Sequence, residues 1–146
     1  MYAFLDKRPG ELAPPHRVLL GALRLWADAL TAGRCAMTPL DALYQHWALE
    51  GALWPTHNFF SWVSVHARRR IVLGCPTCGS VSEDEALLLS AVFPAPQVSP
   101  DATQVALGDL VSDEASPQAL RLAFALGEEL RRHGPFVDNG RNTGFC

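Results

Sequence analysis

Four short motifs typical of helix starts divide this chain into helical segments. Three of them place a hydroxyl residue directly before a proline: TPLD at 38, SPDA at 99 and SPQA at 116. A hydroxyl at the N-cap accepts a hydrogen bond from an unpaired backbone N–H group, and a proline at the next position has no N–H group to leave unpaired. The fourth motif, SEDE at 82, has the Ser-x-x-Glu spacing of a capping box and carries three acidic residues. The motifs predict four helix starts.

The segment 15–32 also shows the pattern of an amphipathic helix. Polar side chains fall on one side of it, where Arg24 and Asp28 can pair across one turn. The opposite side is an apolar stripe, which consists of Leu19, Leu23, Trp26 and Leu30. The glycine at 33 is a natural end for this helix.

The pattern of residues 55–70 predicts a further helix, which places two histidines on opposite faces. His66 shares the apolar face with Phe59, Trp62 and Val63, so we expect it to point into the core. His57 lies on the opposite face, so we expect it to point toward water.

These patterns predict an all-α fold. The expected helices cover 15–32, about 38–51, 55–70, 82–93, 100–112 and 117–133. In the last of these, Phe124 is expected to be buried together with Ala119, Ala123, Leu126 and Leu130. Only RRRIVLG at 68 could form a short extended piece. We therefore expect one domain over 1–146, an antiparallel bundle of five to six helices with an irregular CPTCG loop and irregular termini at 1–14 and 134–146.

Composition narrows the class of protein. Apolar residues make up 49% of the 146 residues and charged residues 18%, which is typical of a globular chain. The net charge of −3 does not favour a nucleic-acid partner. The longest apolar window is interrupted by Arg24 and Asp28, and the start of the chain does not resemble a secretory signal, so we expect a cytoplasmic protein with no membrane partner. Lys7 is the only lysine, a bias that indicates a bacterial source.

Cys75 and Cys78 form the most distinctive motif of the chain. The five residues CPTCG resemble the Cys-Pro-x-Cys-Gly knuckle of zinc ribbons and rubredoxins. In that resemblance, a tight turn lets both thiolates face one metal ion. The resemblance covers only these five residues, and because the chain has no second knuckle, it does not extend to the fold.

A tetrahedral zinc ion needs further ligands, and His66 and Cys35 are the expected ones. His66 lies near the end of the helix that leads into the loop, and Cys35 follows the first helix. Cys146 is a further candidate, and His57 a weaker one because it faces outward. The sequence thus predicts a structural zinc site of Cys75, Cys78, His66 and Cys35, with unreactive thiols as the alternative. A thioredoxin-like redox site is not favoured, because it needs a strand before the pair and a helix start at its first cysteine.

Two features predict a surface for a partner or ligand. Trp54 and Phe60 belong to a cluster of aromatic residues but fall off the central stripes, so they could form an exposed patch or line a pocket. Arg68 and Arg69 lie at the C-terminus of the helix predicted over 55–70, where they complement the helix dipole or contact a phosphate.

Three functional hypotheses remain open from the sequence. The first is a small intracellular helical protein, not an enzyme, that binds another protein and carries the structural zinc. The second is a metal-free helical regulator that binds DNA. The third is a ligand-binding protein or enzyme with a pocket under the aromatic cluster. No HExxH, P-loop or dinucleotide-binding motif is present.

Overall fold

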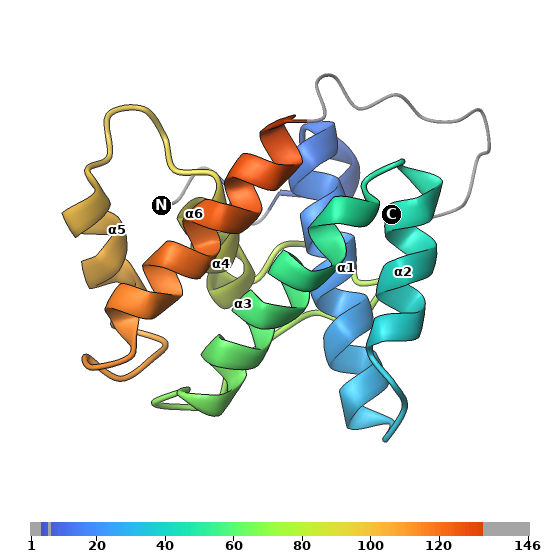
Figure 1. The fold of residues 1–146 in the computed structure, drawn as a ribbon, viewed down its shortest axis with the longest axis horizontal. Coiled ribbons are helices and arrows are strands. Elements are labelled where there is room, and N and C mark those ends of the chain that lie inside the picture. The colour runs from blue at the N-terminus through green and yellow to red at the C-terminus, as the bar shows by residue number, and fades with distance from the viewer. Residues whose placement is uncertain (1–3, 6, 133–146) are drawn as a thin grey trace.

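The computed structural model describes residues 4, 5 and 7–132, and these residues fold into helices joined by loops (Figure 1). Within them, the only β-type pairing is an isolated antiparallel bridge between Ala67 and Val111. The elements in chain order are η2 (Pro9–Glu11), α1 (Pro14–Thr31), α2 (Met37–His46), η3 (Glu50–Ala52), α3 (Leu53–Val65), α4 (Glu83–Val92), α5 (Pro100–Leu107) and α6 (Ser116–Arg132). The prediction of an all-α fold is confirmed. The predicted tail at 134–146 lies outside the described residues.

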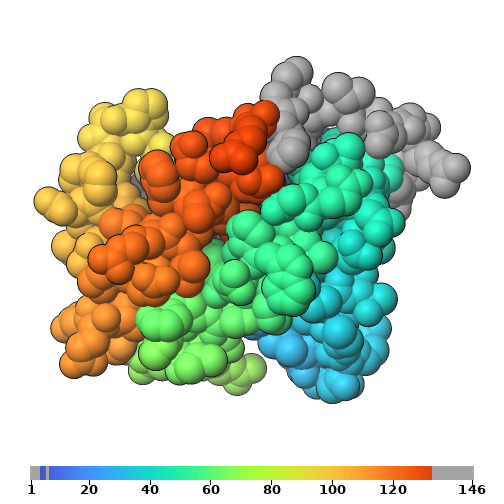
Figure 2. Space-filling view, in the orientation of Figure 1, coloured from blue at the N-terminus to red at the C-terminus, as the bar shows by residue number. Residues whose placement is uncertain are grey.

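Helix α6 packs against helices from both the first and the second half of the chain. It packs against α3 on one side and against α4 and α5 on the other, while α1 packs against α2 and α4. In Figure 1, α1 runs down the view, α2 runs back up and α3 runs down again; Figure 2 shows α3 and α6 side by side on the near face. None of the helices in the described part of the chain is long and apolar enough to cross a membrane.

The core lies where these helices meet. Its large side chains come from most of the helices, so no pair of helices forms a core alone. The largest fully buried ones include Leu19, Leu40, Tyr44, Phe59, Leu89 and Leu126.

Two of the four predicted helix starts have the expected caps. Ser82 caps α4 in a complete capping box: its Oγ accepts a hydrogen bond from the Glu85 N–H group at 3.2 Å, and Glu85 accepts one from the Ser82 N–H group at 2.9 Å. Ser99 caps α5 by accepting from the Ala102 N–H group at 3.1 Å. These two motifs therefore act as predicted.

The other two predicted caps are wrong in detail. Helix α2 begins at Met37, one residue before Thr38, and has no side-chain cap. Ser116 is the first residue of α6, and its hydroxyl donates to the Asp113 carbonyl at 3.0 Å instead of accepting from the helix. In both places the hydroxyl residue lies inside the helix, as the second residue of α2 and the first of α6.

Two expectations about burial are also wrong. Arg24, placed on the polar side of its helix, is only 2% exposed, and it does not pair with Asp28. Phe124, expected in the core, is 61% exposed. Helix α6 buries Ala119, Ala123 and Leu126, and Phe124 lies one position beyond this face, so the helix turns it toward solvent.

Candidate ligand cleft and cysteine loop

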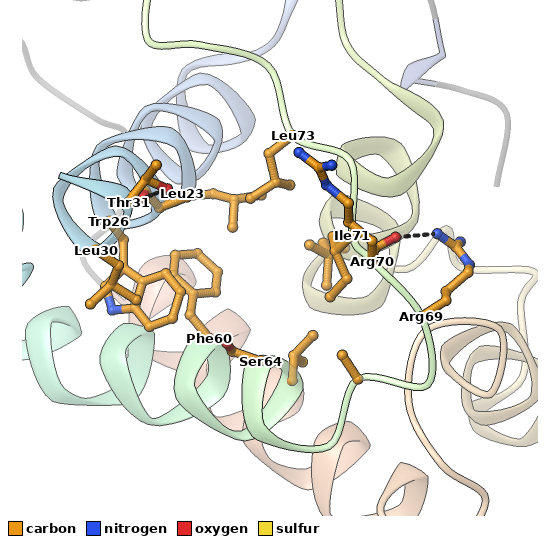
Figure 3. A pocket seen from close by; sticks show the side chains of 14 residues that line it. Leu23, Trp26, Leu30, Thr31, Phe60, Ser64, Arg69, Arg70, Ile71 and Leu73 are labelled. Carbon is orange, nitrogen blue, oxygen red and sulfur yellow. Dashed lines mark hydrogen bonds between the residues drawn. The ribbon is translucent and has the colours of Figure 1, made fainter. Parts of the chain in front are cut away.

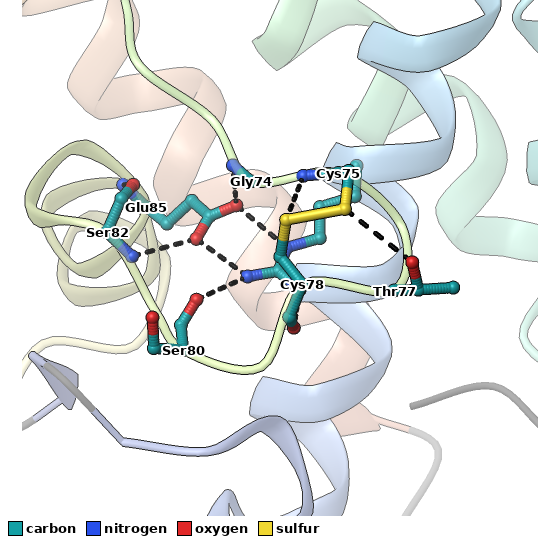
Figure 4. The surroundings of a disulfide bond; sticks show 8 residues. Gly74, Cys75, Thr77, Cys78, Ser80, Ser82 and Glu85 are labelled. Atoms are coloured by element: carbon teal, nitrogen blue, oxygen red, sulfur yellow. Dashed lines mark hydrogen bonds and ion pairs between the residues drawn. A yellow bond between two sulfur atoms is a disulfide. The ribbon is translucent and has the colours of Figure 1, made fainter.

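Residues 66–82 join α3 to α4 without regular structure and carry the cysteine pair. Cys75 and Cys78 are joined in a disulfide bond (Figure 4). The turn between them is tight, because the Cys78 N–H group donates to the Cys75 carbonyl at 3.0 Å and the Cys75 N–H group donates to Cys78 Sγ at 2.9 Å. The turn agrees with the knuckle resemblance, whereas the disulfide differs from the expectation of free or metal-bound thiols.

A buried ion pair between α1 and α4 anchors this loop. Arg24 donates to both carboxylate oxygens of Glu85, from Nε at 2.8 Å and from Nη2 at 3.0 Å. The same guanidinium donates to two loop carbonyls, those of Cys78 and Ser80, at 2.8 Å each. Arg24 is 2% exposed and Glu85 is fully buried. Burying two charges is costly, so these extra hydrogen bonds to the loop are what make the burial tolerable.

Glu85 holds the beginning of the loop as well. Its Oε1 accepts from the Gly74 N–H group at 2.8 Å, directly before the first cysteine. Gly74 packs so closely on the ion pair that a Cβ atom there would lie 2.8 Å from Nη2 of Arg24. The absence of a side chain at Gly74 therefore leaves room for the guanidinium beside the loop.

The pKa of Glu85 reflects these contacts. Burial alone acts to raise it, but hydrogen bonds from Arg24 and from the backbone N–H groups of Ser82 and Gly74 outweigh that effect and hold the pKa below its ordinary value. Glu85 is thus a charged anchor for the loop and for its own helix. The SEDE motif at 82 therefore caps α4 and, through Glu85, also holds the loop before it.

The four predicted zinc ligands do not come together in the described residues. Cys35 is an exposed free thiol, and hydrogen bonds from the backbone of Met37 and Thr38 lower its pKa. His66 is half-buried, and its ring packs on Trp62 with the centroids 4.1 Å apart. In residues 4, 5 and 7–132, no group of three or more histidine, cysteine or carboxylate side chains is placed to hold a metal. Cys146, the further candidate, lies outside this range.

The predicted orientations of the two histidines are wrong. Helix α3 ends at Val65, five residues before its predicted end, so His66 occupies the C-cap and remains half-exposed. His57 is half-buried and accepts a hydrogen bond from the Trp26 indole N–H group at 3.2 Å. Helix α1 approaches the face that the sequence pattern had assigned to solvent.

Three consecutive arginines follow α3, and two of them are paired. Arg68 donates to Asp113 at 2.8 Å. Arg69 donates to both oxygens of Asp84, at 2.7 and 2.9 Å, and this hydrogen bonding lowers the pKa of Asp84. Arg70 is exposed and makes no ion pair with any described residue. Arg68 and Arg69, predicted as part of a partner or ligand surface, therefore pair with carboxylates of the same chain. Arg70 can pair with a bound anion.

A cleft of about 310 Å³ lies beside this segment (Figure 3). Helices α1 and α3 form two of its walls, residues 67–73 form a third, and Leu88 of α4 also lines it. Its main apolar side chains are Leu23, Trp26, Leu30, Phe60, Ile71 and Leu73. Trp54 and Phe60 were predicted to form an exposed patch or to line a pocket. Phe60 is 3% exposed and lines this cleft, whereas Trp54 is 63% exposed and does not line it.

Arg70 gives the cleft a charged edge. Its guanidinium lies close to Leu73 in Figure 3, while Arg69 is turned away and donates to the Arg70 carbonyl. The residues that line the cleft include two hydroxyl groups, from Thr31 and Ser64, but no histidine, cysteine or carboxylate. This composition suits binding and supplies no general base for catalysis.

The comparisons with known proteins give no family. No protein-family model, curated protein or solved structure matches the chain.

Proposed function

We propose that the protein is a helical binding protein whose cleft between α1 and α3 takes a small amphipathic carboxylate. The apolar chain of the ligand lies against Leu23, Phe60 and Ile71, and its carboxylate pairs with Arg70. The observation that carries this proposal is an apolar cleft bordered by an arginine with no ion-pair partner in the described residues. A planar guanidinium pairs with a carboxylate through two parallel hydrogen bonds.

The dimensions of the cleft suggest the size of the ligand. A volume of about 310 Å³ is at the small end of ligand sites, which suits a medium-chain or aryl carboxylate. Each CH₂ group buried contributes about 0.8 kcal/mol, which corresponds to about fourfold in affinity. Affinity is therefore expected to increase with chain length until the cleft is full, and then to level off.

Titration calorimetry with matched eight-carbon ligands tests the proposal. We expect octanoate to bind more tightly than octanol, and we expect Arg70→Met to weaken octanoate binding by about tenfold, the loss of one charge-assisted contact of roughly 1.4 kcal/mol. Arg121→Met, an exposed arginine on α6, is the control and should change nothing. The proposal fails if carboxylates of six to twelve carbons do not bind, or if octanoate binds equally to both variants.

Protein binding is a second candidate, favoured by exposed apolar side chains on α3 and α6. Trp54 is 63% exposed, Val65 78% and Phe124 61%. Val65 also borders a groove of about 410 Å³ between these two helices. A photocrosslinking residue at Val65 should give one discrete adduct in cells if a protein partner docks there, whereas the same residue at exposed Asp101 should give none.

The cellular setting is part of the proposal. We propose a bacterial cytoplasmic protein, on the grounds of its composition, in which Lys7 is the only lysine. A DNA-binding role draws less support, because Arg68 and Arg69 already pair with carboxylates.

Zinc at the reduced Cys75–Cys78 pair stays a separate proposal from the sequence. Its support is the knuckle-like turn, and the ligand-binding function does not depend on it. Elemental analysis of reduced protein, with Cys75→Ser as control, tests it directly: one equivalent of zinc, lost in the variant, supports it, and no bound metal contradicts it.

A further inference from the structure

We infer that the Cys75–Cys78 disulfide is a reversible site of thiol–disulfide exchange, which reacts with a low-molecular-weight thiol at Cys75. This inference does not depend on the ligand cleft. It follows from three features of the loop: the unequal exposure of the two cysteines, the shorter hydrogen bond to the sulfur of Cys78, and the anchoring of the backbone at both ends.

The two sulfurs differ in their surroundings. Cys75 is exposed, so a thiolate from solution can approach its sulfur, whereas Cys78 is half-buried. The Cys75 N–H group donates to Cys78 Sγ at 2.9 Å, whereas Cys75 Sγ has a longer contact, of 3.6 Å, with the Thr77 hydroxyl (Figure 4). A hydrogen bond donated to sulfur stabilises a thiolate there and makes that sulfur the better leaving group. Both effects direct attack to Cys75.

The exchange proceeds in two balanced steps. In the first, an external thiolate attacks Cys75 Sγ; a mixed disulfide forms at Cys75, the Cys75–Cys78 bond breaks, and its electron pair leaves on Cys78. In the second, another thiolate attacks the external sulfur of the mixed disulfide, which releases the oxidised thiol and leaves Cys75 as a thiolate. Overall, two thiols are oxidised to one disulfide, and the protein disulfide gains two electrons and two protons.

The anchoring of the loop makes the reverse step available. Glu85 accepts from the Gly74 N–H group on one side of the pair, and Arg24 donates to the carbonyls of Cys78 and Ser80 on the other. None of these bonds involves a sulfur atom, so they persist when the disulfide is reduced. The two thiols then remain close together and can form the bond again. Transient disulfides of this kind are the ones expected in a reducing compartment.

Glutathione buffers test the inference on the full chain, in a background in which the other two cysteines are replaced (Cys35→Ser, Cys146→Ser). Alkylation of free thiols followed by mass spectrometry gives the oxidised fraction of the pair at each ratio of reduced to oxidised glutathione. We expect one fully reversible transition with a slope for two electrons. A pair that stays oxidised, or stays reduced, at every ratio overturns the inference.

Two single-cysteine variants in the same background test the direction of attack. With oxidised glutathione, the free cysteine thiolate attacks the glutathione disulfide, which is the reverse of the second step. Cys78→Ser should form an adduct at Cys75 about tenfold faster than Cys75→Ser forms one at Cys78, because Cys75 is the more exposed residue. Circular dichroism confirms that both variants are folded. Equal rates, or a faster reaction at Cys78, would contradict the assignment of Cys75 as the sulfur that carries the mixed disulfide.

Discussion

Gly74 and Gly79 lie on either side of the cysteine pair, but their surroundings differ. A Cβ atom at Gly74 would meet the Arg24 guanidinium at 2.8 Å, whereas one at Gly79 would meet nothing within 4 Å. Gly74→Ala should therefore lower the free energy of unfolding by about 1–3 kcal/mol, because the buried ion pair must shift. Gly79→Ala is the matched control and should change it by less than about 0.5 kcal/mol. Urea denaturation of both variants in the oxidised form gives the comparison, and equal effects would contradict this description of the loop.

Arg24 and Glu85 should behave as one unit. Arg24→Met leaves a buried carboxylate without its partner, so we expect it to cost about 3–5 kcal/mol of stability. The double variant Arg24→Met/Glu85→Met removes both charges, and it should be more stable than the sum of the two single effects predicts. A double-mutant cycle measured by urea denaturation decides this. If the single effects simply add, the two residues do not interact as described.

These residues also show what sequence patterns miss at this scale. Leu20 lies one helical turn before Arg24, on the same face of α1, and is 1% exposed. An apolar residue at that position was therefore a sign in the sequence that Arg24 faces inward. Its partner is 61 positions away, and the sequence pattern gives no means of matching the two. Similarly, the spacing of Ser82 and Glu85 predicted the cap correctly but not the second role of Glu85, because that role depends on α1.

Helix α4 begins with two carboxylates whose pKa values lie below the ordinary range. In the unfolded chain, carboxyl groups of this type take up protons near pH 4. The unfolded state therefore binds protons first as the pH falls, and the stability contributed by Asp84 and Glu85 is present above that pH and lost as the pH drops through the lower folded values. The midpoint of urea unfolding should decrease below about pH 5 as these two carboxyl groups take up protons. An earlier decrease between about pH 7 and 5 is expected from His16, because burial lowers its pKa.

The double variant Arg24→Met/Glu85→Met provides the control for this pH effect. Because it lacks the Glu85 carboxyl, its midpoint should decrease less steeply below about pH 5 than that of the natural sequence. The same slope in both proteins would mean that Glu85 is not held as an anion in the fold.

The sequence predicted which helices are present better than it predicted where each helix begins and ends. The starts of α4 and α5 follow from caps made of neighbouring residues, so local patterns suffice. The end of α3 does not: the helix stops at Val65, where the Arg68 N–H group donates to Leu110 and the Ser112 N–H group donates to His66. These contacts come from a distant part of the chain, and they replace the helical continuation that the periodicity predicted.

Across the whole molecule, the all-helical class could be predicted, but the candidate cleft could not. Its walls come from α1, α3 and residues 67–73, so it exists only once these segments pack together. The aromatic cluster did indicate a pocket among the alternatives, and Phe60 lines the cleft between α1 and α3. The cysteine pair was prominent in the sequence, yet the positions of its predicted partners, His66 and Cys35, depend on how the helices pack.

The most direct test of the proposed ligand-binding function is NMR mapping of octanoate on ¹⁵N- and methyl-labelled protein. We predict saturable shifts for the Trp26 indole N–H group and the methyl groups of Leu23 and Ile71, with Val65 on the far side of α3 unchanged. In Arg70→Met the same signals should move only at higher octanoate concentration. Shifts that centre on the α3–α6 groove, or no saturable shifts in the cleft, would contradict the assignment of this cleft as the ligand site.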